Sequence, residues 1–180
     1  MTFRRGIYIV PTNRWYIERT VWLISGLVLL ASTALAAFVN QYLIGFVTIA
    51  GLISMSVALN GYCPVGNVLY FLGFEPMLAE KRVPRPKLYR MRTDSWYLER
   101  RIYLIVGFNL TLSSVLTIVH SHWWWAFTGF VGAASLFFAS TGFCIMANGF
   151  YWTGAEPRLA PEYAAGDPRR VPVAGAPATR

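Results

Sequence analysis

The chain has 180 residues, a net charge of +8, 56% hydrophobic residues and 13% charged residues. Soluble domains carry roughly a quarter charged residues, so this composition excludes an ordinary soluble domain and indicates a membrane protein. The positive charge does not indicate nucleic-acid binding, because no basic segment belongs to a recognisable nucleic-acid-binding fold.

The first apolar block, residues 20–74, contains no Asp, Glu, Lys or Arg. A spanning helix needs about 20 apolar residues, so this block predicts spans over residues 20–39 and 42–61. We expect the first span to be retained rather than cleaved as a secretory signal, because a second span follows at once. Pro64 then predicts the start of a short interfacial helix that ends at Gly73.

The second apolar block, residues 102–155, is also free of charged residues. It predicts spans over 102–120 and 123–143 and a second short helix within 144–154. The breaks between paired spans are expected at residues 39–41 and 120–122. Because no ionisable residue is expected at bilayer depth, ion-coupled transport is disfavoured.

The two blocks are copies of one another. The segment Trp15-Tyr16-Ile17-Glu18-Arg19 recurs 81 positions later as Trp96-Tyr97-Leu98-Glu99-Arg100, and the register holds without a gap from Thr12 and Thr93 to Ala79 and Ala160. Other equivalent pairs are Gly26 and Gly107, Gly51 and Gly132, Cys63 and Cys144, and Glu75 and Glu156. The chain is therefore divided into an N-terminal segment 1–11, repeat 12–79, a basic linker 80–92, repeat 93–160 and a Pro/Ala-rich tail 161–180.

The expected fold is an all-α integral membrane protein with four transmembrane helices in two tandem hairpins. An even number of spans per repeat gives both copies one orientation, so we expect a pseudo-two-fold axis along the membrane normal. All 16 Lys and Arg residues lie before the first span, between the second and third, or after the fourth. By the positive-inside rule, both termini and the linker are expected in the cytoplasm of a bacterium, with the spans in its inner membrane.

Several side chains are candidates for particular roles at the membrane surfaces. Thr12-Asn13 and Thr93-Asp94-Ser95 are the expected helix N-caps. The expected interfacial anchors are Trp15, Arg19, Trp96, Arg100, Trp123, Trp124 and Trp125. His120 and His122 are interpreted as polar residues of the outer turn, with a metal or haem contact as the alternative.

The two cysteines, Cys63 and Cys144, are candidate reactive thiols at the cytoplasmic ends of the second and fourth spans. A thiolate there would accept persulfide sulfur or nitric oxide; the alternative is that both are small packing residues. A metal site would need more ligands on the same side of the membrane, so neither a metal nor a cofactor is expected.

The segment Gly61-Tyr62-Cys63-Pro64, followed by Leu72-Gly73, resembles the YgaP-like transmembrane domain, a two-helix hairpin of unknown function often attached to inner-membrane rhodaneses. Arg19 and Gly26 match the Arg and Gly at the start of that family's first helix. The resemblance covers residues 12–79 and 93–160. The second copy departs from the pattern at Ile145, where the family has Pro, and the chain carries no rhodanese domain. The resemblance implies paired membrane hairpins with a tie to sulfur species.

Three function classes remain open at this stage. The favoured class is a non-catalytic accessory subunit that packs on a larger bioenergetic or photosynthetic membrane complex, with the lipid bilayer and the complex's subunits as partners. The alternatives are thiol-based handling of sulfur species and passage of a small molecule between the paired hairpins. No catalytic motif is present in the sequence, so an enzyme is not expected.

Overall fold

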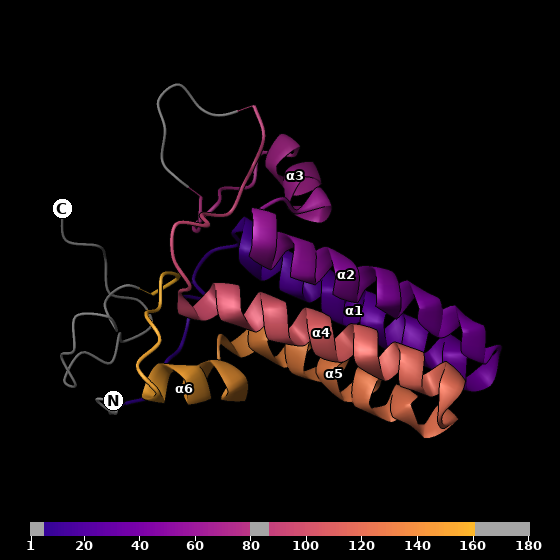
Figure 1. The fold of residues 1–180 in the computed structure, drawn as a ribbon. Helices are drawn as coiled ribbons and strands as arrows, with labels where there is room; N and C mark the ends of the chain where they lie inside the picture. Colours follow the sequence, from indigo (N-terminus) through magenta and orange to yellow (C-terminus); the bar gives the residue numbers. More distant parts are fainter. Residues whose placement is uncertain (1–5, 80–86, 161–180) are drawn as a thin grey trace, which may run out of the picture.

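The computed structural model describes residues 6–79 and 87–160, which are built from helices (Figure 1). Within these two ranges the extended pairings are isolated β-bridges, so the described chain is all-helical. In chain order the elements are α1 (Ile17–Phe38), η1 (Gln41–Ile44), α2 (Gly45–Asn60), α3 (Pro64–Phe71), α4 (Leu98–Val119), η2 (His122–Trp124), α5 (Trp125–Thr141) and α6 (Ile145–Trp152).

Three helical stretches are long and apolar enough to span a membrane: Ile17–Phe38, Gln41–Asn60 and Leu98–Val119. This is consistent with a multi-pass membrane protein, the class that the composition predicted. The remaining long helix, α5, has 17 residues. At 1.5 Å per residue it is about 25 Å long, slightly less than the ~30 Å hydrocarbon core of a bilayer.

The breaks between the long helices lie where the sequence predicted them. The side chain of Asn40 accepts a hydrogen bond from the N–H of Tyr42 at 2.9 Å, which ends α1 and begins η1. His120 caps the C-terminal end of α4 in the second copy. At the opposite end of the bundle, Gly61 and Gly142 end α2 and α5 with φ of 75°, a left-handed conformation that favours glycine.

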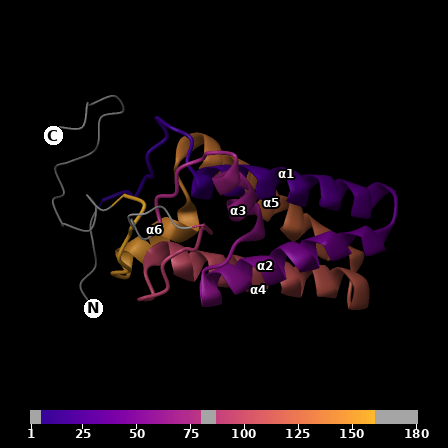
Figure 2. The ribbon, with the colours of Figure 1, turned by 90° about the horizontal axis from the view of Figure 1, so that it is seen from above.

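Each long helix packs mainly against a helix of the other repeat. α1 lies along α5 and α2 lies along α4, whereas α1 with α2 and α4 with α5 share few contacts. In the view of Figure 2, α1 lies beside α5 and α2 lies beside α4. Each helix of a predicted hairpin therefore has its main packing partner in the other hairpin.

Glycines allow close approach at the two main helix crossings. A Cβ added at Gly26 of α1 would lie 3.0 Å from the carbonyl oxygen of Gly132 of α5. A Cβ at Gly107 of α4 would lie 2.6 Å from the carbonyl oxygen of Gly51 of α2. These two crossings occupy equivalent positions in the repeats. Without glycine at these positions the helix axes would have to move apart.

The two short helices predicted after the cysteines are confirmed. α3 has Pro64 at its first position, where the missing N–H of proline costs no hydrogen bond. α6 begins at Ile145 without a proline. Gly73 and Gly154 follow the two helices with φ of 93° and 91°. Their position at the membrane interface stays a prediction.

Three predicted regions lie wholly or partly outside the described residues. They are the N-terminal segment 1–11, of which 6–11 are described, the linker 80–92, of which 87–92 are described, and the tail 161–180, which lies outside.

Candidate functional site

A buried carboxylate near the start of α1 holds the chain that follows α3. Glu18 is 1% exposed, and its oxygens accept hydrogen bonds from the N–H groups of Met77 at 3.0 Å and Leu78 at 2.7 Å. The hydroxyl of Tyr89 donates a further bond to Glu18 Oε1 at 3.1 Å. Hydrogen bonds to a charged acceptor are among the strong ones, so these four residues, the Glu18 cluster, tie three separate segments together.

The second repeat contains the equivalent cluster. Glu99 accepts hydrogen bonds from the N–H groups of Arg158 at 2.9 Å and Leu159 at 2.8 Å. The hydroxyl of Tyr8 donates to Glu99 Oε1 at 2.7 Å. Each member of this Glu99 cluster is 81 positions from its counterpart, and the tyrosine of each cluster belongs to the segment that leads into the other repeat's first helix.

Two buried arginines cap helix ends across the repeats. Arg19 Nε donates to the carbonyl of Ala139 in the last turn of α5 at 2.7 Å, and its Nη1 donates to the carbonyl of Thr12 at 2.8 Å. Arg100 makes the equivalent bonds to Ala58 in α2 at 2.6 Å and to Thr93 at 2.9 Å. The last carbonyls of a helix lack helical partners and carry partial negative charge, so a guanidinium is a suitable cap.

The predicted N-caps are wrong, because the helices begin later than expected. α1 and α4 start at Ile17 and Leu98, and their N-cap residues, Tyr16 and Tyr97, make no side-chain capping bond. The first N–H groups instead donate to carbonyls of the post-α3 and post-α6 segments, at 3.0 Å for Ile17 and 2.8 Å for Leu98. The threonine carbonyls serve the buried arginines, as described above.

The segment that leads into the first helix of each repeat packs against the short helix of the other repeat. The side-chain amide of Asn148 in α6 bonds both the N–H and the carbonyl of Tyr8, at 2.6 and 3.0 Å. Asn67 in α3 makes the same pair of bonds to Tyr89, at 2.9 and 3.0 Å. These contacts extend the equivalence of the two copies at least four residues before position 12.

The predicted anchor residues fall into two environments. The guanidinium groups of Arg19 and Arg100 lie 4.0 Å above the rings of Trp15 and Trp96, which are about half exposed. The other predicted anchors are in or next to η2 at the opposite end of the bundle: Trp123, Trp124 and Trp125. Trp123 and Trp125 stack with centroids 5.9 Å apart. Their depth in a membrane stays a prediction.

The two candidate thiols differ in their surroundings. Cys63 is 5% exposed and its sulfur accepts a hydrogen bond from the N–H of Gly66 at 3.2 Å, which caps α3. Burial raises the pKa of the Cys63 thiol, and this disfavours the reactive thiolate. Cys144 is only half-buried, does not cap α6, and lines a cavity.

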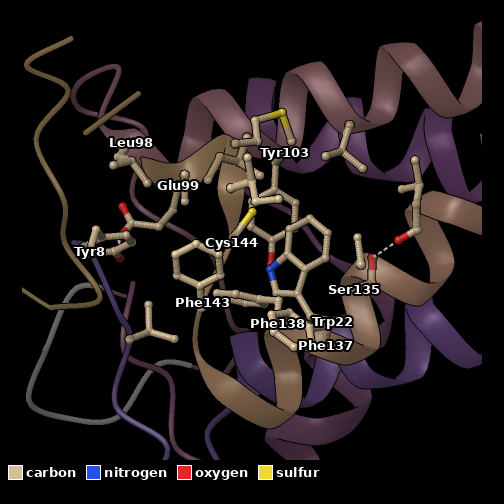
Figure 3. A pocket seen from close by; sticks show the side chains of 18 of the residues that line it. Tyr8, Trp22, Leu98, Glu99, Tyr103, Ser135, Phe137, Phe138, Phe143 and Cys144 are labelled. Atoms are coloured by element: carbon tan, nitrogen blue, oxygen red, sulfur yellow. Dashed lines mark hydrogen bonds between the residues drawn. The ribbon is translucent and has the colours of Figure 1, made fainter. Parts of the chain in front are cut away.

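That cavity lies between α4, α5 and α6 and has a volume of about 340 Å³. Figure 3 shows Trp22 of α1 and Tyr103 of α4 near Cys144, with Phe137, Phe138 and Phe143 around them. Tyr8 and Glu99, bonded to each other, also line it. The cavity thus joins an apolar interior to the Glu99 cluster.

An exposed ion pair lies beside the Glu99 cluster. Arg158 Nη1 donates to Asp94 Oδ1 at 2.7 Å, and the Arg158 guanidinium lies 4.4 Å above the Tyr97 ring. This hydrogen bond from Arg158 holds the pKa of Asp94 well below its usual range. The pair connects the start of the second repeat to the chain after α6.

Within residues 6–79 and 87–160, no three His, Cys, Asp or Glu side chains gather as a metal site would require. His120 Nδ1 accepts a hydrogen bond from Trp124 Nε1 at 3.1 Å.

Only some of the residues that hold the two repeats together were recognised from the sequence. Glu18 and Glu99 were noticed as repeated residues, but their burial was not foreseen. Tyr8 and Asn67 were not singled out. Extending the offset of 81 back to position 8 would have paired Tyr8 with Tyr89, and the same offset pairs Asn67 with Asn148.

The three long apolar helices are consistent with a multi-pass membrane protein. No family model, curated protein or solved structure matches the chain.

Proposed function

We propose that the chain is a non-catalytic integral membrane protein that packs as an accessory subunit against a larger membrane complex, bioenergetic or photosynthetic. It spans the bacterial inner membrane four times, with both termini and the linker in the cytoplasm. The short helix α5 completes its span together with η2, just as η1 and α2 do in the first copy. The confinement of the basic residues to one side supports this orientation.

The pseudo-two-fold arrangement is part of the proposal. Its support is the equivalence of specific contacts: Arg19 with Ala139 and Arg100 with Ala58, and the glycine crossings of α1 with α5 and of α2 with α4. Because each bond recurs at the same offset, one rotation relating the copies accounts for all of them.

The observation that carries the accessory role is how the polar side chains are used. Glu18, Arg19, Glu99 and Arg100 are buried and bond to the chain's own backbone. Many large aromatic and aliphatic side chains of the long helices are exposed instead, among them Leu27, Phe46, Phe108 and Phe130, each more than half exposed. A protein organised in this way presents apolar surface to lipid and to neighbouring membrane helices.

The test combines extraction with crosslinking. The tagged protein is extracted from native membranes in a mild detergent, separated by size and analysed by mass spectrometry. A photoreactive amino acid is placed in turn at Leu27, Phe46, Phe108 and Phe130, one position on each long helix. We expect co-migration with a large complex and a protein crosslink from one side of the bundle. Migration alone, with no protein crosslink from any of the four positions, contradicts the proposal.

The thiol alternative is favoured only by the accessibility of Cys144. Single variants Cys63→Ser and Cys144→Ser, labelled with a maleimide, separate the two sulfurs. Cys144 is expected to react faster, because Cys63 is buried with a raised pKa. The passage alternative requires a polar path through the bundle, whereas Trp22 and Tyr103 pack together between α1 and α4.

The origin of the chain as a tandem duplication of a YgaP-like hairpin is also a proposal. It rests on the Gly61–Pro64 segment and on the helix-capping Arg19, whose counterpart in the second copy is Arg100. Cys63 has a structural role here as the cap of α3, so the resemblance by itself does not favour sulfur chemistry.

A further inference from the structure

The cavity between α4 and α5 exists because these two helices barely touch each other. Each is packed against a helix of the first repeat, α4 against α2 and α5 against α1. The space of about 340 Å³ left between them is lined at one end by Ile145, Met146 and Ala147 of α6. Its volume is in the range of small-molecule binding sites.

The interior of this cavity offers hydrocarbon rather than hydrogen bonds. Phenylalanines line it from α5 and the turn into α6, and several of the polar side chains in its wall already bond to the protein itself. Ser135 Oγ donates to the carbonyl of Val131 at 2.8 Å, and Asn109 Nδ2 donates to the carbonyl of Ile105 at 2.8 Å. Glu99 is occupied by its own cluster. The mainly apolar wall therefore suits an apolar chain, because a polar occupant would lose most of its hydration without equivalent new partners.

The cavity opens sideways, between the helices. Phe130 and Phe137 line it and are 66% and 54% exposed. In a bilayer this opening faces the lipid acyl chains, so an apolar chain enters without crossing water. An apolar chain in this opening would also keep the cavity wall in contact with the hydrocarbon core.

Two basic residues adjoin lining residues in the sequence at one end of the cavity. Arg101 is exposed in the first turn of α4, immediately before the lining residue Ile102, and its Nε donates to the carbonyl of Trp96 at 2.8 Å. Arg158 immediately precedes the lining residue Leu159, but its guanidinium is already paired with Asp94, so Arg101 is the cation that remains for a head group. Because the chain has a net charge of +8 and the proposed orientation puts its basic residues on the cytoplasmic side, an anionic head group is attracted here.

We infer that this cavity binds one acyl chain of an anionic phospholipid, with the phosphate head group at the α6 end near Arg101. The inference rests on the membrane placement proposed above and is independent of any partner subunit.

Native mass spectrometry of the full chain tests it, after reconstitution with phosphatidylglycerol or phosphatidylcholine carrying the same acyl chains. Ala134 and Ala133 are adjacent, exposed residues of α5, but only Ala134 lines the cavity. We expect wild type and Ala133→Phe to retain one phosphatidylglycerol and little phosphatidylcholine, and Ala134→Phe to lose the bound lipid. Equal retention by the two variants overturns the cavity as the site, and equal retention of the two lipids overturns the head-group preference.

A second readout does not depend on survival of the complex in the gas phase. In a Cys63→Ser background, maleimide labelling of Cys144 is measured in bilayers with and without phosphatidylglycerol. Slower labelling with phosphatidylglycerol is expected, since the occupant covers the cavity wall that includes Cys144. An unchanged labelling rate overturns the lipid site. If the same protein still requires detergent for extraction and still co-migrates with its complex, the membrane placement and the accessory role are unaffected by that result. Extraction without detergent would instead overturn the membrane placement.

Discussion

Trp22 and Tyr103 occupy equivalent positions in the two repeats, and their rings pack against each other with centroids 5.1 Å apart. Residues related by a rotation touch each other only close to the rotation axis. This contact therefore supports the proposed pseudo-two-fold symmetry and indicates where its axis passes, between α1 and α4. Phe138 packs edge-on against Trp22 at 5.9 Å, so aromatic rings fill the bundle at this level.

The glycine crossing of α2 and α4 predicts a large effect from a small substitution. In Gly51→Ala the new Cβ would lie 2.8 Å from the carbonyl oxygen of Gly107, so the helices must separate. We expect a loss of about 1–3 kcal/mol in the free energy of unfolding, as for other overpacked sites. Thermal unfolding in detergent measures it. Gly45→Ala is the control, because no atom lies within 4 Å of its added Cβ; equal midpoints for the two variants would contradict the close crossing.

The buried guanidinium of Arg100 is expected to be irreplaceable by lysine. Its Nε and Nη1 bond Ala58 in one helix and Thr93 in another segment, and a single ammonium cannot replace this divided geometry. Arg100→Lys should lower the free energy of unfolding by at least about 2 kcal/mol, since each bond to a charged group contributes ~1.5–3 kcal/mol. The neighbouring Arg101→Lys, at an exposed residue, should unfold like the wild type. An unchanged stability of Arg100→Lys would show that the positive charge alone is sufficient, and an equal loss in both variants would show that the effect is not specific to the buried geometry of Arg100.

The hydroxyl of Tyr89 gives a pH-dependent prediction. Burial, followed by the nearby Glu18 charge, raises its pKa well above the ordinary value of about 10. A raised folded-state pKa means that the contribution to stability is complete below pH ~10 and is lost as the pH rises toward the folded-state value. Tyr89→Phe should be less stable than the wild type at neutral pH by about 1.5 kcal/mol, the loss of one bond to a carboxylate. Denaturation series should show this gap narrowing above pH ~10; a gap independent of pH would be inconsistent with the raised pKa.

An imperfect match between the copies predicts a stabilising substitution. Ser114 on α4 bonds the hydroxyl of Thr48 at 2.8 Å, but its counterpart Thr33 faces Gly129. In the described part of the chain, Thr33 Oγ1 is buried without a hydrogen-bond partner. Thr33→Val should therefore raise the free energy of unfolding by about 1 kcal/mol, because it removes an unpaired buried hydroxyl without changing the shape. The paired control, Ser114→Ala, should lower it. A loss of stability in both would mean that Thr33 has a partner in the membrane.

The exchange of helices predicts that the chain can be cut in two. Residues 1–84 and 85–180, co-expressed as separate chains, should copurify because α1 needs α5 and α2 needs α4. The control carries Gly26→Leu and Gly51→Leu in the first fragment, which blocks both crossings and should abolish copurification. Independent recovery of two folded fragments would show that each hairpin is a complete packing unit.

Sequence reasoning succeeded where one local signal was sufficient. The charge-free blocks placed the long helices, Asn40 and His120 marked the breaks, and Pro64 marked the short helix. It was wrong about the N-caps because Thr12 and Thr93 contribute their carbonyls, rather than their side chains, to Arg19 and Arg100. A side-chain cap can be read from neighbouring residues, but a carbonyl that accepts from an arginine cannot.

The candidate site depended on contacts between distant parts of the chain. The sequence shows Glu18 and Glu99 only as repeated residues next to an arginine, and burial of a carboxylate is costly unless it is hydrogen-bonded. The cost is offset by N–H donors some 60 residues away, in the segments after the short helices. No sequence pattern indicated the cavity either, because it lies between α4 and α5, and their separation depends on how the whole bundle packs.

The exchange between repeats also sets the order of events during synthesis. α1 and α2 leave the ribosome before the helices they pack against exist, and Glu18 is made well before Tyr89. In the proposed membrane placement, the first hairpin would lie in the bilayer with Gly26 and Gly51 uncovered until the second hairpin inserts. A chain that stopped before α4 would keep these positions exposed to the cell's quality-control proteases.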